Sequence, residues 1–247
     1  MTYQKKVIFV AKLKLKTNHH SYVPIALVAP DNYVSEQYRK LRTNIEFSDF
    51  NQTIQTIALT STIGGEGKTV TTINLGVVYA QSESKTLIID MDLRKPKLHR
   101  GFNLINKVGL TDIITDKLEY KDVIQTINPH LDILTSGTKL PFPSEFLMSK
   151  QVKNLMDQFK KEYDRIIIDT PPMSAVSDAS VISRYVDGFV IVVASRLSHS
   201  ETAQNVIENL KANGAKIIGS VLTRIQKKDE RYYRDYYYTY DEKLKRK

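Results

Sequence analysis

The chain has 247 residues, of which 41% are hydrophobic, and it carries a formal net charge of +9 at pH 7. A chain of this length and composition can bury a full core in one or two domains. It contains no cysteine, which excludes a disulfide framework and thiol chemistry. No apolar stretch approaches the ~20 residues that a membrane-spanning helix needs.

The first part of the chain, residues 1–30, has no sustained hydrophobic period, and we expect a leader segment there. It carries several lysines, and the last residues of the chain are again rich in Lys and Arg. Basic ends of this kind suit an anionic membrane surface or acidic partners, although runs of charge are usually only solvated.

A helix is expected to begin at residue 36, with Ser35 as its N-cap. Glu36, Arg39 and Arg42 are spaced by three residues, so they form one charged stripe along this helix. Two interpretations are open. The stripe is either a solvent-exposed face with a weak internal ion pair, or a specific contact surface that uses the planar arginine side chains.

A glycine-rich loop at residues 60–69 follows an apolar run at 54–59 and precedes a predicted helix at 70–80. Loops in this position bind nucleotide phosphates, because their N–H groups and the helix N-terminus point at one anion. We expect Lys68 to contact the β- and γ-phosphates and Thr69 to bind Mg²⁺. The predicted nucleotide-binding residues of this region are Gly64, Gly65, Glu66, Gly67, Lys68, Thr69 and Val70.

Two further apolar runs end in acidic residues. Asp90 and Asp92 follow one predicted strand, and Asp169 follows another. Residues i and i+2 lie on the same side of an extended chain, so the first two carboxylates repel each other unless a cation lies nearby. The carboxyl ends of parallel strands meet at one edge of a sheet. We therefore expect Asp92 and Asp169 to hold Mg²⁺ together with Thr69.

The rest of the chain alternates predicted strands and helices. This alternation predicts a single α/β domain over residues 31–225, with a mostly parallel sheet and helices on both faces. Strands are expected at residues 86–91, 131–135, 165–168, 188–194 and 216–222, a short helical turn at 109–114, and helices at 149–161, 175–185 and 200–213.

The C-terminal residues 226–247 contain six of the fourteen tyrosines and charges of both signs. They have no helical or alternating apolar face, so we expect a mobile tail with a root-mean-square reach of roughly 25 Å. If the chain carries a kinase site, these tyrosines are its phosphate acceptors; the alternative is an aromatic and basic tail that contacts nucleic acid. The candidate acceptors are Tyr232, Tyr233, Tyr236, Tyr237, Tyr238 and Tyr240.

Three motifs together resemble those of the bacterial tyrosine kinases of the P-loop type, a family tied to capsule and exopolysaccharide synthesis. They are the phosphate loop at residues 61–69, the Asp90-x-Asp92-x-Arg94 sequence and Asp169-Thr170-Pro171-Pro172. Partition and septum-site ATPases share the phosphate loop but typically carry a further lysine where this chain has Ile63. The resemblance implies an ATP-dependent protein-tyrosine kinase with a P-loop NTPase fold of the partition-ATPase-like class.

The residues also suggest individual roles, because phosphoryl transfer needs mainly positioning and charge neutralisation. We expect a catalytic set in which Lys68 offsets phosphate charge and Asp90 accepts or orients the tyrosine hydroxyl proton, although Asp90 and Asp92 can exchange roles. Arg94 would steady the acceptor or the developing charge.

Base recognition is expected after the last strand. Members of the family often supply an asparagine to the adenine from that loop. In this chain Thr223 and Arg224 stand there, so they are the candidates for contact with the base.

The resemblance further implies partners. The Glu36-x-x-Arg39-x-x-Arg42 sequence resembles the family's subunit-contact motif, which implies a homo-oligomeric ring and phosphorylation of the tail between subunits. Members are commonly activated by the cytoplasmic tail of a transmembrane polysaccharide chain-length protein, and the leader at 1–30 is a candidate for such a tail.

A cognate phosphotyrosine phosphatase is also expected, nucleic acid is not, and the chain is expected in the cytoplasm at the inner face of the membrane through its membrane partner. The alternative function is a partition- or septum-type ATPase switch without kinase activity.

Overall fold

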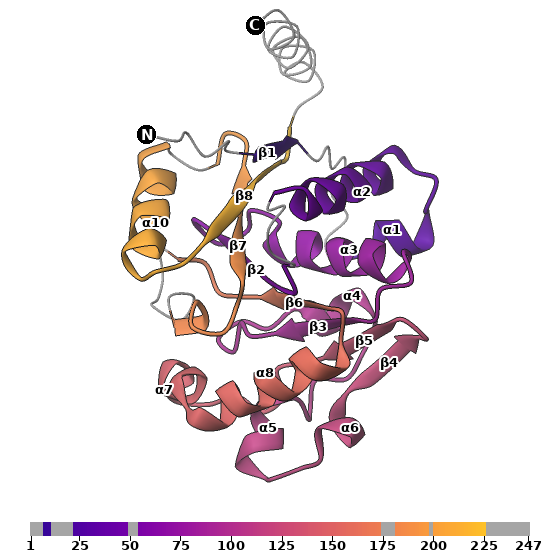
Figure 1. The fold of residues 1–247 in the computed structure, drawn as a ribbon, viewed down its shortest axis with the longest axis vertical. Helices are drawn as coiled ribbons and strands as arrows, with labels where there is room; N and C mark the ends of the chain where they lie inside the picture. The colour runs from indigo at the N-terminus through magenta and orange to yellow at the C-terminus, as the bar shows by residue number, and fades with distance from the viewer. Residues whose placement is uncertain (1–6, 11–21, 49–53, 174–180, 198–199, 226–247) are drawn as a thin grey trace, which may run out of the picture.

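The computed structural model describes residues 7–10, 22–48, 54–173, 181–197 and 200–225 (Figure 1). Its centre is an eight-stranded sheet in the order β1-β8-β7-β2-β6-β3-β5-β4. Neighbouring strands are parallel except for β4 and β5, so the predicted mostly parallel sheet is confirmed. The strands are β1 (Val7–Val10), β2 (Thr56–Ser61), β3 (Thr86–Asp90), β4 (Gln125–Asn128), β5 (Leu131–Leu134), β6 (Arg165–Asp169), β7 (Gly188–Ala194) and β8 (Ile217–Thr223).

Helices cover both faces of this sheet, as predicted (Figure 1). Helices α1 to α4 contribute to the hydrophobic core on one face, and α5 to α8 together with α10 contribute to the core on the other. Because both faces are covered, β2 and β3 are buried along their whole length. The helices are α1 (Ile25–Val28), α2 (Tyr33–Glu46), α3 (Lys68–Ala80), α4 (Leu98–Gly101), α5 (Leu110–Thr115), α6 (Tyr120–Val123), α7 (Pro143–Met148), α8 (Lys150–Glu162) and α10 (Ser200–Ala212).

The topology brings three strand ends together. β2, β6 and β3 are consecutive in the middle of the sheet. Asp169 at the end of β6 is the register partner of Asp90 on β3 and of Leu59 on β2. The Met91 N–H donates to the Asp169 carbonyl oxygen (2.8 Å), which keeps the exit of β3 beside β6. The predicted convergence of the acidic strand ends at one edge is confirmed.

Strands β1 and β4 have no counterpart among the predicted strands. β4 contains one apolar residue among polar ones, and β1 is a short apolar run that periodicity alone cannot distinguish from a buried helix segment. β1 lies at the edge of the sheet beside β8, and α1 buries Ala26, whose N–H donates to Asn74 Oδ1 on α3 (2.9 Å). These described parts of the leader pack on the sheet and on α3, while the domain boundary at residue 30 stays a prediction.

The predicted cap of α2 is wrong. The helix begins at Tyr33, and the Asn32 side chain caps it by accepting a hydrogen bond from the Val34 N–H (2.8 Å). The Ser35 hydroxyl donates to the Ala29 carbonyl oxygen (2.7 Å) and fastens α2 to the preceding turn. Asn and Ser are both favoured caps, so the local sequence does not choose between them.

Several predictions fall outside the described residues. They include residues 175–180 of the helix predicted at 175–185, most of the leader, and all of residues 226–247 with the six candidate acceptor tyrosines. Among the residues that the structure describes, no helix combines the length and the apolarity needed to cross a bilayer.

Candidate active site

The phosphate loop joins β2 to α3, as the sequence predicts. Gly65 and Gly67 have φ values of +87° and +93°, in the left-handed region that favours glycine because it has no Cβ. Gly67 is the residue before α3, and a Cβ added at Gly64 would meet no atom within 4 Å. The loop N–H groups and the N-terminus of α3 thus form a cradle for an anion.

The Glu66 side chain holds this loop from the inside. Its carboxylate is buried; Oε2 accepts hydrogen bonds from the Thr62 hydroxyl (2.7 Å) and the Ile63 N–H (2.9 Å). Oε1 accepts a third from the Ala194 N–H at the end of β7 (3.0 Å). The side chain of this predicted nucleotide-binding residue therefore fastens the loop to β7, and its contact with a phosphate stays a prediction.

The end of β8 grips the loop from the other side. The buried Thr223 hydroxyl donates to the Glu66 carbonyl oxygen (2.6 Å). The exposed Arg224 donates to the Gly65 carbonyl oxygen through Nη2. Both residues thus lie at the phosphate loop, and their contact with adenine stays a prediction.

Lys68 lies between two carboxylates. Its Nζ is 2.6 Å from Asp169 Oδ1 and 3.6 Å from Asp92 Oδ2, and its side chain is only 8% exposed. Burial on its own lowers the pKa of Lys68, but Asp169 and Asp92 outweigh this effect and raise the pKa. The ammonium is therefore charged, as a phosphate-binding lysine must be.

Asp169 also accepts hydrogen bonds from two threonines of α3. The Thr69 hydroxyl donates to Oδ2 (2.7 Å), and the Thr72 hydroxyl lies 3.2 Å from Oδ1. The predicted residues Lys68, Thr69, Asp92 and Asp169 are thus brought together. Thr72 was not predicted, although its position four residues after Lys68 places both on one face of α3.

Asp90 closes the loop that follows β3. It is completely buried: Oδ1 accepts from the Asp92 N–H (3.1 Å), and Oδ2 accepts from the N–H groups of Lys97 (3.1 Å) and Leu98 (3.0 Å). Burial, and after it repulsion by Asp169, raises the pKa of Asp90 to about 8. Asp92 is the member of the pair with residual exposure.

The charges of this centre suit a divalent cation that arrives with a nucleotide. Among the residues that the structure describes, the carboxylates of Asp90, Asp92 and Asp169 share the site with the ammonium of Lys68. Mg²⁺ takes oxygen ligands and needs only one or two carboxylates when phosphates supply the rest, and Thr69 adds a hydroxyl. Within the described ranges, no group of three or more acidic or histidine side chains could hold a metal ion. The residues therefore fit Mg²⁺ bound together with phosphates.

Comparisons with known proteins agree with this geometry. The family model described as an AAA domain matches residues 54–220. The tyrosine-protein kinase YwqD of Bacillus subtilis is 42% identical over 199 residues, which are 80% of this chain and 84% of YwqD. The chain belongs to the bacterial tyrosine-protein kinases. The tyrosine-protein kinase etk of Escherichia coli strain K12 is a longer relative: it is 32% identical over 91% of this kinase but only 31% of etk.

Solved structures place the kinase in the same family. The chimerical protein CapA2B2 is 37% identical, with a TM-score of 0.82, over 89% of this chain and 95% of that one. The septum site-determining protein MinD of Pyrococcus horikoshii, complexed with Mg-ADP, has a TM-score of 0.58 at 25% identity, over 69% of this chain and 70% of MinD. The kinase therefore shares its fold with the partition-type ATPases but is more similar to the kinases.

Arg94 of the kinase connects the site to α7. It is exposed, and its Nη2 lies 3.2 Å from the Ser144 hydroxyl. The side chain so links the loop after β3 to the first turn of α7, a contact that the spacing of the motifs did not indicate. Its predicted action on the acceptor stays a prediction.

The three charged side chains of the α2 stripe do not all contact one another. Arg39 Nη1 lies 3.0 Å from Glu36 Oε2, and Arg39 Nη2 donates to the Pro30 carbonyl oxygen (2.7 Å). Arg42 Nη1 turns to α3 and donates to the Val78 carbonyl oxygen (2.7 Å). The internal ion pair is confirmed, and the subunit contact stays a prediction; Glu36 is exposed, whereas Arg39 and Arg42 are half-buried.

Proposed function

We propose that this kinase transfers the γ-phosphoryl group of ATP to tyrosines in residues 226–247 of another subunit, and so regulates capsular or exopolysaccharide synthesis. The observation that carries the proposal is the contact of Lys68 with both Asp92 and Asp169 beside the phosphate loop. A lysine and two carboxylates in this position can neutralise a transferring phosphoryl group and hold its cation.

The phosphate side of the reaction rests on the residues of α3 and the acidic strand ends. Lys68 and the loop N–H groups would offset the negative charge that develops on the transferring group. Thr69, Asp92 and Asp169 would hold Mg²⁺, which supplies further charge neutralisation when bound. Hydrogen bonds to Asp169 already position Lys68 and Thr69 at the loop.

The acceptor side rests on the carboxylate pair. A general base works best when its pKa lies near the operating pH, and the pKa of Asp90 is about 8. Asp92 retains exposure, and its N–H donates to Asp90. The tyrosine hydroxyl would therefore meet Asp92, which is buried except for a small exposed fraction, while Asp90 orients the hydroxyl and takes part in accepting the proton.

The length of the C-terminal segment favours transfer between subunits. The tyrosines begin seven residues beyond Ile225, the last described residue. With the expected reach of roughly 25 Å, they enter a neighbouring site more readily than they reverse into their own. A homo-oligomeric ring, with Glu36 and Arg39 at its contacts, would raise the effective concentration of acceptors.

The setting in the cell is part of the proposal. We expect a transmembrane activator that holds the kinase in the cytoplasm at the inner face of the membrane, and a phosphatase that removes the phosphate. Two observations support a joined partner: etk is about three times as long as the matched region, and the similar CapA2B2 is a chimera. The leader, with β1 beside β8, is the segment of this chain that would correspond to an activator tail.

The test compares the full chain with a chain ending at Ile225, each with labelled ATP and Mg²⁺. We expect phosphotyrosine on the full chain, mapped to residues 232–240, and none on the shortened chain, which still binds nucleotide. Label mapped mainly to Tyr38, Tyr79 or Tyr163 would contradict the tail assignment. Release of phosphate without any phosphotyrosine would instead support an ATPase switch.

A further inference from the structure

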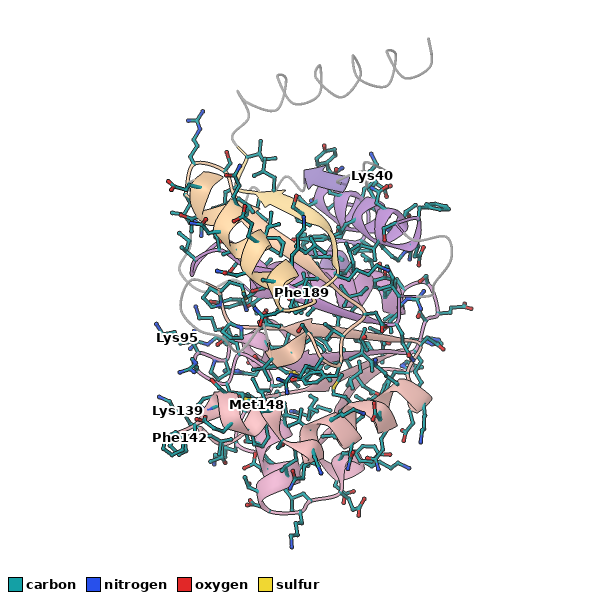
Figure 2. All side chains as sticks on the ribbon, turned by 60° about the vertical axis from the view of Figure 1, so that its left-hand side comes forward. Lys40, Lys95, Lys139, Phe142, Met148 and Phe189 are labelled. Carbon is teal, nitrogen blue, oxygen red and sulfur yellow. The ribbon has the colours of Figure 1, made fainter. Side chains whose placement is uncertain are left out.

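Two large apolar side chains of α7 and its preceding loop lie in solvent. Phe142 is 67% exposed and Met148 is 52% exposed. The lysines Lys95 and Lys139 are also exposed: Figure 2 labels Lys95, Lys139 and Phe142 at the left-hand edge of the molecule and Met148 further in, with Lys40 on α2 at the opposite end. We call these four residues the acceptor platform. Exposed apolar groups beside charges mark binding surfaces.

The acceptor platform adjoins the carboxylate pair. The Lys95 N–H donates to Asp92 Oδ1 (3.1 Å), so the backbone of Lys95 borders the active site. One residue earlier, Arg94 reaches the Ser144 hydroxyl, two residues after Phe142. A peptide with one side chain at Asp92 would therefore run over the acceptor platform.

The loop that carries Lys139 and Phe142 is braced. Asp112 Oδ2 accepts from the Thr138 N–H (3.1 Å), and Asn106 Oδ1 accepts from the Gly137 N–H (2.9 Å). On the other side of Phe142, Pro143 is buried and begins α7. Phe142 is thus held in solvent by a defined backbone, which reduces the entropy lost when a partner binds.

The tyrosine segment matches the platform in charge and in side-chain type. Residues 229–242 contain five acidic residues and two arginines, a net charge of −3, although the chain as a whole is basic. The acidic residues flank the tyrosines: Asp235 precedes Tyr236, and Asp241 follows Tyr240. Acidic groups suit the two lysines, and a neighbouring tyrosine ring suits Phe142.

We propose that the acceptor platform binds residues 229–242 of a second copy and selects tyrosines with acidic neighbours. Lys95 and Lys139 contact the flanking carboxylates, and Phe142 packs against a tyrosine next to the one in the site. The inference rests on the proposed function, because it names the residues that recognise the acceptor of that reaction.

The experiment separates donor and acceptor in full-length chains. The kinase copy has its six tail tyrosines replaced by Phe, and the acceptor copy carries Lys68→Met. Initial rates over a range of acceptor concentrations give kcat and the KM for the acceptor. We expect Phe142→Ala, and separately Lys95→Glu with Lys139→Glu, to raise this KM about tenfold, while kcat stays within about twofold.

Matched controls show whether the effect is local. Phe47→Ala removes another exposed phenylalanine (60% exposed). Lys161→Glu with Lys211→Glu makes the same charge change far from the site. The two exposed lysines lie near the C-terminal ends of α8 and α10, which lead into the N-terminal ends of β6 and β8, whereas the site lies at the carboxyl ends of the strands. These variants should leave the KM unchanged, and every variant should bind ATP like the parent.

A complementary acceptor completes the test. An acceptor with Asp235→Lys, Asp241→Lys and Glu242→Lys should be poor for the parent kinase and better for the Lys95→Glu, Lys139→Glu kinase. An unchanged KM in the platform variants, an equal rise in the controls, or no such reversal overturns the inference. Absence of phosphotyrosine with the parent kinase and the parent acceptor would instead refute the proposed function.

Discussion

Lys68 pairs with two of three neighbouring buried carboxylates, so its removal tests the chemistry and the stability of the site together. Lys68→Met should lower autophosphorylation at least about 100-fold, because the charge that stabilises the transferring group is lost. It should also cost roughly 3–5 kcal/mol of stability, since a buried ion pair is broken from one side. Phosphotyrosine blots and thermal unfolding measure the two effects.

The loss of stability should be smaller at pH 6 than at pH 8, because the unpaired carboxylates can take up protons. Lys153→Met is the control: Lys153 pairs with Asp157 at 2.6 Å, but both side chains are about half exposed, and such a surface pair contributes less than about 1 kcal/mol. Autophosphorylation by Lys68→Met at the parent rate would mean that the active site is assigned wrongly.

The buried Asp90 makes the stability of the kinase depend on pH. Its folded pKa of about 8 lies above the ordinary value of 3.8, so the folded state resists its ionisation. Stability from this group is complete below about pH 4 and is lost as the pH rises to about 8, at about 1.4 kcal/mol per pKa unit at most. Asp90→Asn should therefore flatten the fall of melting temperature between pH 5 and pH 8.

The baseline stability of Asp90→Asn should also drop, because an amide cannot accept all three backbone hydrogen bonds. Asp112→Asn is a useful comparison: burial raises the pKa of Asp112, but hydrogen bonds from Thr138 and Gly109 outweigh it and lower the pKa. Its ionisation contributes stability that is lost only as the pH falls through acidic values. The same slope in Asp90→Asn and the parent would show that another group titrates.

At the scale of elements, β7 holds the phosphate loop through a backbone N–H at its end, and β8 holds it through a side chain. The Thr223 hydroxyl donates to the Glu66 carbonyl oxygen, and Glu66 binds the Ala194 N–H. Thr223→Val keeps the shape but removes the donor, and leaves a buried carbonyl oxygen without this hydrogen bond. We expect a loss of about 1–3 kcal/mol and weaker nucleotide binding.

Calorimetric titration with Mg-ADP and thermal unfolding measure both effects. Thr223→Ser retains the hydroxyl and should bind Mg-ADP nearly like the parent. Equal affinity in the Val, Ser and parent chains would show that β8 does not position the loop.

At the scale of the whole molecule, the contacts of Arg42 change how the ring is best tested. Replacing the whole stripe by alanine also removes the bond from Arg42 to α3. Exchanging Glu36→Arg with Arg39→Glu keeps an internal ion pair but reverses the charges shown to a neighbour. We expect smaller assemblies and slow, concentration-dependent autophosphorylation, with stability lowered by no more than about 1.5 kcal/mol, because the exposed hydrogen bond from Arg39 to the Pro30 carbonyl oxygen is also lost.

Sedimentation velocity measures the assembly, and a phosphotyrosine time course measures the reaction. Arg42→Ala is the comparison, because it should lower the stability of the fold more than it changes the subunit contact. If the exchanged variant assembles and reacts like the parent, the stripe is a solvated helix face.

The strands of the sheet centre and the phosphate loop were readable from the sequence, because their signals are local. The strands that carry Asp90 and Asp169 are long apolar runs, as strands covered on both faces must be. The loop needs glycines where φ is positive and a lysine at the start of its helix, and both stand in order in the chain. Convergence of the acidic residues followed from parallel pairing alone.

The sequence by itself thus determined the fold class, the position of the phosphate loop and the convergence of Lys68, Thr69, Asp92 and Asp169, but it did not indicate Thr72. Only the tertiary structure decided which distant partner each polar group takes: that Glu66 and Thr223 brace the loop, and that Arg42 turns to α3. The physical reason is that such partners lie many residues away in the chain. A buried polar group must be satisfied, but its residue type does not say by whom.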